Sequence, residues 1–362
     1  MSWLTIITSI VLGFVFLGKG AEWLVGGSTV LARRMGVSAM VVGLTVVAWG
    51  TSLPEVVVSV GAAVDSSAAL SLGNVLGSNI ANIGLVLGTC AIVLPAVLEG
   101  RLAGREIFWF LLAILLLLVF CLDSKLVRVE GAVLLGVFTG HTWDVFRQAK
   151  LQARLSGSPG ALDAGDLDPA IGGLAAEVEA LTNIGERAVH WYKHPVLETI
   201  LGMVSIALGA WLVVYGAKGG ATVLGVDERI VGLTVVALGT SLPELAAGVG
   251  GALKGEKDIS MGNVVGSNIF NVLAVMGLTA VVHPLDAEWE LANADPEIAQ
   301  KASNEVAKAF DGALASDFPL AIGFSLFLIA LPLLGGARFG RLKGALLLSI
   351  YVGYSVWLYY KG

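Results

Sequence analysis

The chain has 362 residues, of which 56% are hydrophobic and 14% are charged, and its formal net charge is −6. An ordinary soluble domain carries about 25% charged residues, and several apolar runs here approach the roughly 20 residues that cross a bilayer core. This composition excludes a soluble enzyme and a disordered chain, and the dispersed basic residues exclude a nucleic-acid binder. The two cysteines, Cys90 and Cys121, lie in apolar runs and indicate neither a disulfide framework nor a zinc site.

We predict an all-α polytopic membrane protein with about ten transmembrane helices, because long apolar runs recur along the chain between polar loops. The first run has no basic flank and no small-residue cleavage site, so we interpret it as a helix and not as a signal peptide. The predicted spans are Trp3–Leu31, Ala39–Val64, Leu70–Leu94, Ile107–Leu122, Val127–Val145, Val196–Leu224, Ile230–Leu253, Ile259–Val282, Phe318–Leu334 and Leu342–Tyr360.

The loops that follow odd-numbered spans hold most of the lysine and arginine residues found in loops, including the pair Arg33 and Arg34. Short loops rich in lysine and arginine stay in the cytoplasm, so this bias places the odd-numbered loops inside the cell. Both termini are therefore expected outside, and an even number of spans agrees with that arrangement.

Two polar inserts interrupt the spans. Residues 147–195 form a predicted cytoplasmic insert, in which the apolar residues from Ile171 to Ile184 have helical spacing. Residues 283–317 form a predicted external insert that is rich in acidic residues, with Asp295 as the N-cap and Pro296 as the first position of a short helix. We favour a solvated amphipathic helix there over a surface that gathers cations.

A duplication at an offset of 189 residues is the strongest feature of the sequence. Gly43–Glu55 reads GLTVVAWGTSLPE and Gly232–Glu244 reads GLTVVALGTSLPE, so twelve of thirteen positions agree. Gly73–Gly88 and Gly262–Gly277 share the pattern GNVxGSNIxN at the same offset. Each copy belongs to a five-helix repeat, the first in residues 1–146 and the second in residues 196–362.

An odd number of spans in each repeat makes the second copy enter the membrane from the opposite side. The two repeats are then related by a pseudo-two-fold axis in the membrane plane, which is the inverted-repeat architecture of secondary transporters. Substrate sites in such folds lie near the midplane, at interrupted helices in matching positions of the two halves. The second and third spans of each repeat occupy those positions here.

The GTSLPE segments supply oxygen ligands for a cation. Pro54 and Pro243 each remove a helical hydrogen bond, so the carbonyls before them become available at membrane depth. Glu55 and Glu244 follow the prolines near the middle of their spans, where a carboxylate costs roughly 3 kcal/mol or more to insert. Two such carboxylates near one axis need a proton or a metal cation between them, and their summed charge would neutralise one calcium ion. A purely structural role and a proton-carrying role remain the alternatives.

The second motif places a hydroxyl and an amide on one helix face. Ser78 and Asn82 are four residues apart, and Ser267 and Asn271 repeat the arrangement, so each pair points in one direction. We expect these faces to lie opposite the glutamates. For Asn74, Asn79, Asn263 and Asn268, hydrogen bonding between helices and contact with an ion remain equally good interpretations.

At these two motifs the sequence resembles the cation/calcium exchanger superfamily, and it is most similar to prokaryotic sodium/calcium antiporters. The resemblance implies Glu55 and Glu244 as the central ligands of calcium and sodium, in a multi-pass protein of the prokaryotic inner (plasma) membrane. Many members carry Asp where this chain has Asn271, and the departure argues against a potassium-dependent exchanger. Proton-coupled relatives often depart from Asn in this motif, so by this resemblance Asn82 and Asn271 together favour sodium coupling. The further ligands that the resemblance implies are Thr51, Ser52, Thr240, Ser241, Ser78, Asn82, Ser267 and Asn271.

We therefore predict a secondary active transporter that exchanges calcium for sodium by alternating access, and not an enzyme. It would need no cofactor, and its partners would be the two ions and the lipid bilayer, with no nucleic acid and no obligatory protein partner. A calcium/proton antiporter on the same fold is the alternative. A cation channel and a membrane receptor fit less well, because a single-chain inverted repeat with a central carboxylate pair is typical of a carrier.

Overall fold

The computed structural model describes residues 2–93, 101–155, 194–224, 237–293, 296–330 and 340–361, and these residues are helical apart from short connections. The first repeat contains α1 (Trp3–Met35), α2 (Ala39–Val42), η1 (Gly43–Val47), α3 (Ala48–Thr51), α4 (Leu53–Val64), α5 (Ala68–Ala81), η2 (Asn82–Leu87), α6 (Gly88–Val93), α7 (Arg101–Cys121) and α8 (Arg128–Leu155), where η marks a π-helical turn. The second contains α10 (Pro195–Val223), α12 (Ala237–Thr240), α13 (Leu242–Leu253), α14 (Lys257–Phe270), η4 (Asn271–Val275), α15 (Met276–Val282), α16 (Ala287–Asn293), α17 (Pro296–Gly312), η5 (Ala313–Asp317), α18 (Phe318–Ala330) and α19 (Arg341–Lys361).

Helices occupy the described parts of all ten predicted spans. The end of the third span, the start of the seventh and the end of the ninth lie outside the described residues. Within the described ranges, five helices are long and apolar enough to cross a membrane. A sixth span results when Ala39–Thr51 and Leu53–Val64, which meet at 45°, count as one broken helix. The all-helical membrane fold is thus confirmed, and the total of ten spans stays a prediction.

The two inserts differ from expectation at their edges. Helix α8 continues to Leu155, so the residues after Val145 extend a span, while residues 156–193 lie outside the described part. Helix α17 begins at Pro296 as predicted, but it runs without a break through η5 into α18. The segment Ser303–Ala330 is the candidate span there by its length and hydropathy, and its α17 part buries Val306 and Phe310.

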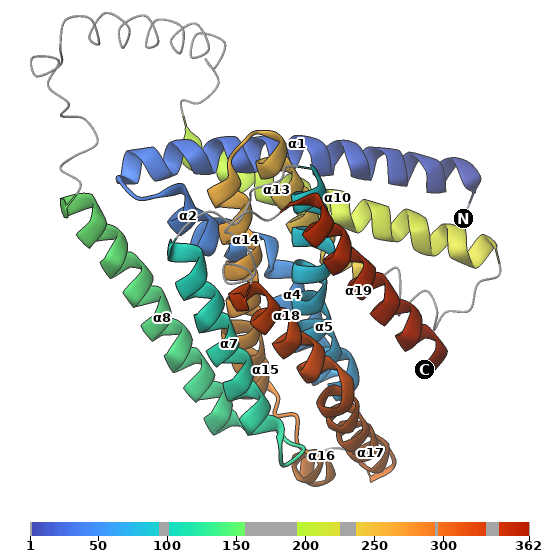
Figure 1. Cartoon of the computed structure of the whole chain (residues 1–362). Helices are drawn as coiled ribbons and strands as arrows, with labels where there is room; N and C mark the ends of the chain where they lie inside the picture. The colour runs from blue at the N-terminus through green and yellow to red at the C-terminus, as the bar shows by residue number, and fades with distance from the viewer. Residues whose placement is uncertain are drawn as a thin grey trace, which may run out of the picture.

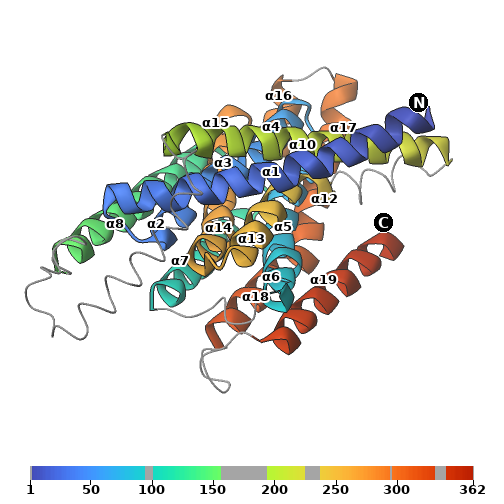
Figure 2. The same ribbon diagram turned by 90° about the horizontal axis from the view of Figure 1, so that it is seen from above.

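Helices α1 and α10 lie side by side across the remaining helices, which form a bundle beneath them in Figure 1. Figure 2 shows the same pair from above, crossing the bundle as one layer. The principal hydrophobic core lies inside the bundle, where α5, α7 and α14 bury side chains such as Leu76, Ile114 and Val264. This arrangement separates a two-helix layer from a packed core.

Glycines at seven-residue spacing form the contact between α1 and α10. A methyl group added at Gly20 would lie 2.9 Å from the carbonyl oxygen of Gly202, and one added at Gly202 would lie 2.8 Å from that of Gly20. Gly13 and Gly209 show the same mutual approach, at 2.8 Å in both directions. These glycines therefore pack the two helices against each other, as small residues do in membranes.

The glycine contacts also establish the symmetry of the fold. Gly13 and Gly202 are equivalent under the 189-residue offset, and so are Gly20 and Gly209. Replacing every glycine by its equivalent turns the contact of Gly13 with Gly209 into the contact of Gly202 with Gly20, as a two-fold axis requires. The axis passes near Ser205, whose Oγ donates a hydrogen bond of 2.9 Å to the carbonyl of its own equivalent, Phe16.

We predict that Gly20→Ala lowers the stability of the protein by about 1–3 kcal/mol, because its methyl group would meet backbone atoms of α10 that cannot move aside. Gly18→Ala is the matched control, since a methyl group there has no neighbour within 4 Å. Thermal unfolding of the purified variants in detergent would check this. Equal unfolding midpoints for the two variants would contradict the close packing.

Candidate functional site

Both GTSLPE segments interrupt their helices at the serine. Ser52 has φ −90° and ψ 10° between α3 and α4, and Ser241 has φ −87° and ψ −1° between α12 and α13. Pro54 and Pro243 then lie in the first turn of the new helix, where a missing N–H costs nothing. The predicted interruption is therefore confirmed in both repeats.

Each break places a glutamate at the beginning of a helix. Glu55 lies in the first turn of α4 and Glu244 in the first turn of α13, and both side chains are completely buried. The positive end of a helix dipole favours a carboxylate at this position. The Ser52 hydroxyl donates a hydrogen bond of 2.8 Å to Oε1 of Glu244, and the Ser78 hydroxyl donates one of 3.4 Å to Oε1 of Glu55.

Each of the two carboxylates has one oxygen that accepts no hydrogen bond in the described part of the chain. These oxygens are Oε2 of Glu55 and Oε2 of Glu244, and both are buried. Neither glutamate forms an ion pair with a described lysine, arginine or histidine. The two negative charges also repel each other across the site. A buried pair of this kind calls for a positive charge between or beside the carboxylates.

Asparagine and threonine side chains link the two repeats reciprocally. Thr51 Oγ1 donates to Oδ1 of Asn263 at 3.0 Å, and its equivalent Thr240 donates to Oδ1 of Asn74 at 3.4 Å. The same asparagines donate to the carbonyls of the glutamates, Asn74 to Glu55 at 3.4 Å and Asn263 to Glu244 at 3.5 Å. Asn74 and Asn263 thus hold the glutamate turns in place through hydrogen bonds between helices, and their contact with an ion stays an alternative prediction.

The remaining asparagines divide into paired and unpaired groups. Asn268 accepts hydrogen bonds from two residues of the first repeat: Asn79 donates to its carbonyl at 3.4 Å and Asn82 to its Oδ1 at 3.1 Å. Asn271 is fully buried, and neither its amide nitrogen nor its oxygen has a partner among the described residues. Oδ1 of Asn82 is also buried and unpaired. The amide oxygens of Asn82 and Asn271 therefore remain available to a ligand.

The predicted hydroxyl residues lie around the carboxylates. Thr51 Oγ1 and Ser267 Oγ are 3.4 Å apart, and Ser267 also donates to the carbonyl of Ala48 at 3.4 Å. The hydroxyl of Ser241 is buried and has no partner in the described residues. Ser52, Ser78, Thr51 and Ser267 thus take part in the polar cluster, and Thr240 joins it through Asn74.

Two features of the site were not predicted from the sequence. Asn82 and Asn271 each begin a π-helical turn, η2 and η4, and such turns occur often at functional sites. Met203 and Val214 of α10 cover Gly50 and Gly239 so closely that neither glycine has room for a side chain. The shared asparagine could have suggested the first feature, whereas no local signal identifies the second.

We predict that Asn268→Ala lowers stability by about 1–3 kcal/mol more than Asn271→Ala in a buffer without calcium or sodium. The first change removes an acceptor and leaves the buried amide of Asn82 unpaired, whereas the second removes an amide that has no partner. Both substitutions delete the same atoms from buried positions, so each serves as the other's control. Equal losses in a thermal unfolding measurement would show that Asn271 is as structural as Asn268.

Known proteins resemble the whole chain. The sodium/calcium exchanger protein family matches residues 5–143 and 194–360. The chain is 33% identical over 350 residues to the putative antiporter CaxA of Alkalimonas amylolytica, with 97% of each chain covered. It is 28% identical over 364 residues to the sodium/calcium exchanger MaX1 of Methanosarcina acetivorans, again with 97% of each covered. A solved structure of the sodium-calcium exchanger NCX_Mj superposes with a TM-score of 0.72, at 27% identity and 97% coverage of both chains. The chain therefore belongs to the sodium/calcium exchanger protein family.

Proposed function

We propose that the protein exchanges calcium for sodium across the prokaryotic inner membrane, with the ions bound between Glu55 and Glu244. One observation carries the proposal: two fully buried carboxylates occupy equivalent positions of the two repeats, and each keeps an oxygen without a partner. As a member of an exchanger family, the protein is a transporter and not an enzyme.

The oxygens available at the site match calcium. Calcium takes 6–8 oxygen ligands at roughly 2.3–2.6 Å and accepts carboxylate, amide and hydroxyl oxygens in an irregular shell. The unpaired buried oxygens of the two motifs, within the described residues, are Oε2 of both glutamates, Oγ of Ser241 and Oδ1 of Asn79, Asn82 and Asn271. Magnesium demands a tight octahedron and keeps its water, and zinc or copper would favour imidazole or thiolate.

Competition for the carboxylates would make the protein an exchanger. Calcium or a set of sodium ions neutralises the pair, but one pair cannot serve both sets. An empty site leaves two bare carboxylates in a medium of low dielectric constant, which impedes the change between inward and outward access. Crossing is therefore favourable only with one set of ions bound, and calcium moves in exchange for sodium.

The asparagines support sodium over protons as the coupling ion. Asn82 and Asn271 occupy positions where an acidic residue could carry a proton, but an amide does not ionise in the physiological range. The relative MaX1 bears the name of a sodium/calcium exchanger, whereas CaxA is named only as a putative antiporter. A calcium/proton antiporter with the same carboxylate pair is the second candidate.

The two repeats differ in how the α1–α10 layer covers them. Leu242 and Ala246 of α13 pack against a hydrophobic cluster in which α1 and α10 supply most of the buried residues, whereas their equivalents on α4, Leu53 and Val57, are 56% and 72% exposed. Helix α4 runs toward the side that the loop charges predict as external. The α1–α10 layer therefore closes the predicted cytoplasmic half of the site and leaves the external half uncovered, as one state of alternating access requires.

The proposal predicts calcium uptake into proteoliposomes that are loaded with sodium, driven by the outward sodium gradient. Glu55→Gln and Glu244→Gln should each reduce this uptake about a hundredfold, because a buried charge loses its partner. Glu22→Gln is the matched control, since Glu22 is exposed and paired with Lys19 at 2.9 Å. Radioactive calcium counted after filtration gives the rates.

A second set of vesicles with a pH gradient and no sodium separates the two candidates. Uptake driven by protons and indifferent to sodium would replace the proposal with calcium/proton exchange. Full sodium-driven uptake by both glutamate variants would refute the assignment of the site.

A disulfide should lock the state that the structure shows. A methyl group added at Gly250 would lie 2.9 Å from Cβ of Ala21, so Ala21→Cys with Gly250→Cys is expected to crosslink α1 to α13 under oxidation. The crosslink would hold the predicted cytoplasmic half closed and stop exchange, and a reducing agent would restore it. The native thiols of Cys90 and Cys121 are buried.

The symmetry supplies the control for this experiment. Gly61 and Ala210 are equivalent to Gly250 and Ala21, but nothing approaches Gly61 within 4 Å in this state. The pair Gly61→Cys with Ala210→Cys should crosslink only during turnover, when α10 covers α4. Equally fast crosslinking of both pairs without ions would contradict the assigned state.

A further inference from the structure

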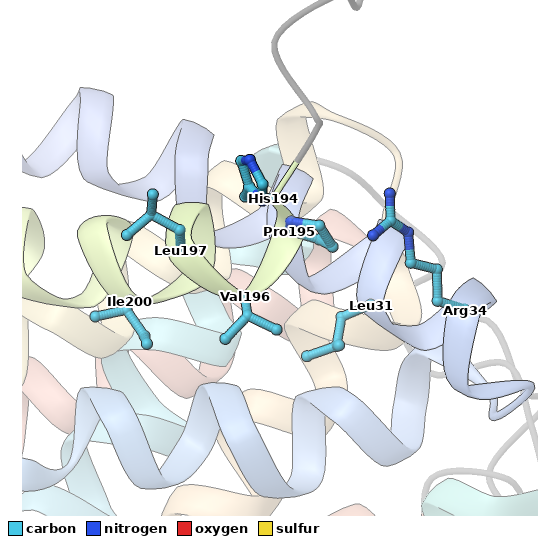
Figure 3. Close-up of a pocket in the computed structure, with 7 residues that line it drawn as sticks. All are labelled: Leu31, Arg34, His194, Pro195, Val196, Leu197 and Ile200. Atoms are coloured by element: carbon cyan, nitrogen blue, oxygen red, sulfur yellow. The ribbon is translucent and has the colours of Figure 1, made fainter.

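A groove of about 500 Å³ opens between the end of α1 and the beginning of α10 (Figure 3). Leu31 of α1 and Val196, Leu197 and Ile200 of α10 form its apolar wall. The three α10 side chains are 54%, 52% and 49% exposed. None of the residues around the carboxylate pair lines this groove, so it is a separate feature of the molecule.

The upper rim of the groove is polar. Figure 3 shows Arg34 and His194 at this rim, while Leu31 and Val196 point toward each other below them. Arg34 is an exposed residue of the last turn of α1, and no carboxylate within the described ranges pairs with it. Its guanidinium can therefore bind an anion without giving up an ion pair in these ranges.

The beginning of α10 adds positive potential at the same rim. Helix α10 is 29 residues long and starts with Pro195, and the first N–H groups of a helix have no acceptor within it. The acidic residue of the first turn, Glu198, is two residues beyond Val196 and so points away from the groove wall. It interacts electrostatically with Lys254 at the end of α13 and with His194 at the rim.

We propose that this groove binds an anionic phospholipid, with its phosphate at Arg34 and the beginning of α10 and an acyl chain along the apolar wall. The complementarity has two parts, since the rim is cationic and the wall below it is apolar and open. A free phosphate ion would use only the rim. The groove also lies at the end of α1 that the loop charges place in the cytoplasm, and the cytoplasmic leaflet carries the anionic lipids.

A lipid in this position would contact both helices of the α1–α10 layer at once. Leu31 and Arg34 belong to α1, and the rest of the groove belongs to α10 or directly precedes it. The glycine contact continues to the beginning of α10, where a methyl group added at Gly27 would lie 2.8 Å from the carbonyl oxygen of Pro195, and the lipid would lie beside this contact. Binding does not depend on which ions the protein transports, so the test does not rest on the proposed function.

The test uses the full chain in phosphatidylcholine vesicles that contain phosphatidylglycerol with a photoreactive diazirine on its acyl chain. After illumination, mass spectrometry of the digested protein should find the label on Val196, Leu197 or Ile200. Unlabelled phosphatidylglycerol should compete, and phosphatidylcholine should not. Arg34→Gln should weaken the competition about fivefold, the effect of one arginine at an anionic membrane surface.

Arg33→Gln is the matched control, because Arg33 is adjacent and exposed but does not line the groove, so its variant should behave as the unchanged protein. Thermal unfolding verifies that both variants are folded. Equal labelling by a phosphatidylcholine probe, or equal effects of the two substitutions, would overturn the proposal. Competition by glycerol 3-phosphate at the same concentration would assign the rim to a free phosphate, and a crosslink to another copy of the chain would assign the groove to that copy.

Discussion

The burial of two carboxylates that repel each other is the main electrostatic cost that this fold has to offset. Glu55 and Glu244 are completely buried, and without a cation their charges would make the folded state costly. The fold lowers this cost locally, since each glutamate begins a helix and accepts a hydrogen bond from a serine. It does not remove the cost, because each carboxylate keeps an unpaired oxygen. We propose that a bound cation relieves this remaining cost.

Because of the inverted repeat, the glutamate turn and its hydrogen bonds occur twice in the molecule. Thr51 donates a hydrogen bond to Asn263, and Thr240 donates one to Asn74. The position of each glutamate turn is therefore fixed by a hydrogen bond to the opposite repeat. The glycines between α1 and α10 obey the same two-fold axis. The symmetry fails where Ala21 contacts Gly250 while Gly61 remains open. A symmetric pair of repeats in an asymmetric arrangement has a second arrangement of similar energy, which is the physical basis of the alternating access that we propose.

The asparagines show how similar side chains in one motif separate into two roles. Asn74, Asn263 and Asn268 have hydrogen bonds between helices, which fix the geometry of the bundle. Asn271 lies in the same motif but begins a π-helical turn and has no partner in the described residues. The π-helical turn therefore coincides with the change from a structural amide to one that is available for an ion.

The internal repeat, the positions of the two helix breaks and the two membrane-embedded glutamates could be predicted from the sequence alone. A proline interrupts its own helix wherever that helix packs, so Pro54 and Pro243 predicted the breaks at Ser52 and Ser241 without tertiary information. The contacts between side chains that are distant in the sequence are known only from the tertiary structure. Helical spacing placed Ser267 and Asn271 on one face but could not name their partners, and the glycines of α1 could have faced the core as well as α10. Hydropathy began the predicted ninth span at Phe318, whereas the helix extends back through η5 into α17, whose Val306 and Phe310 are buried in the core. A proline or a helical spacing affects only a few neighbouring residues, so its effect can be predicted from the sequence. The contact partners of a side chain depend on how helices that are distant in the sequence pack together.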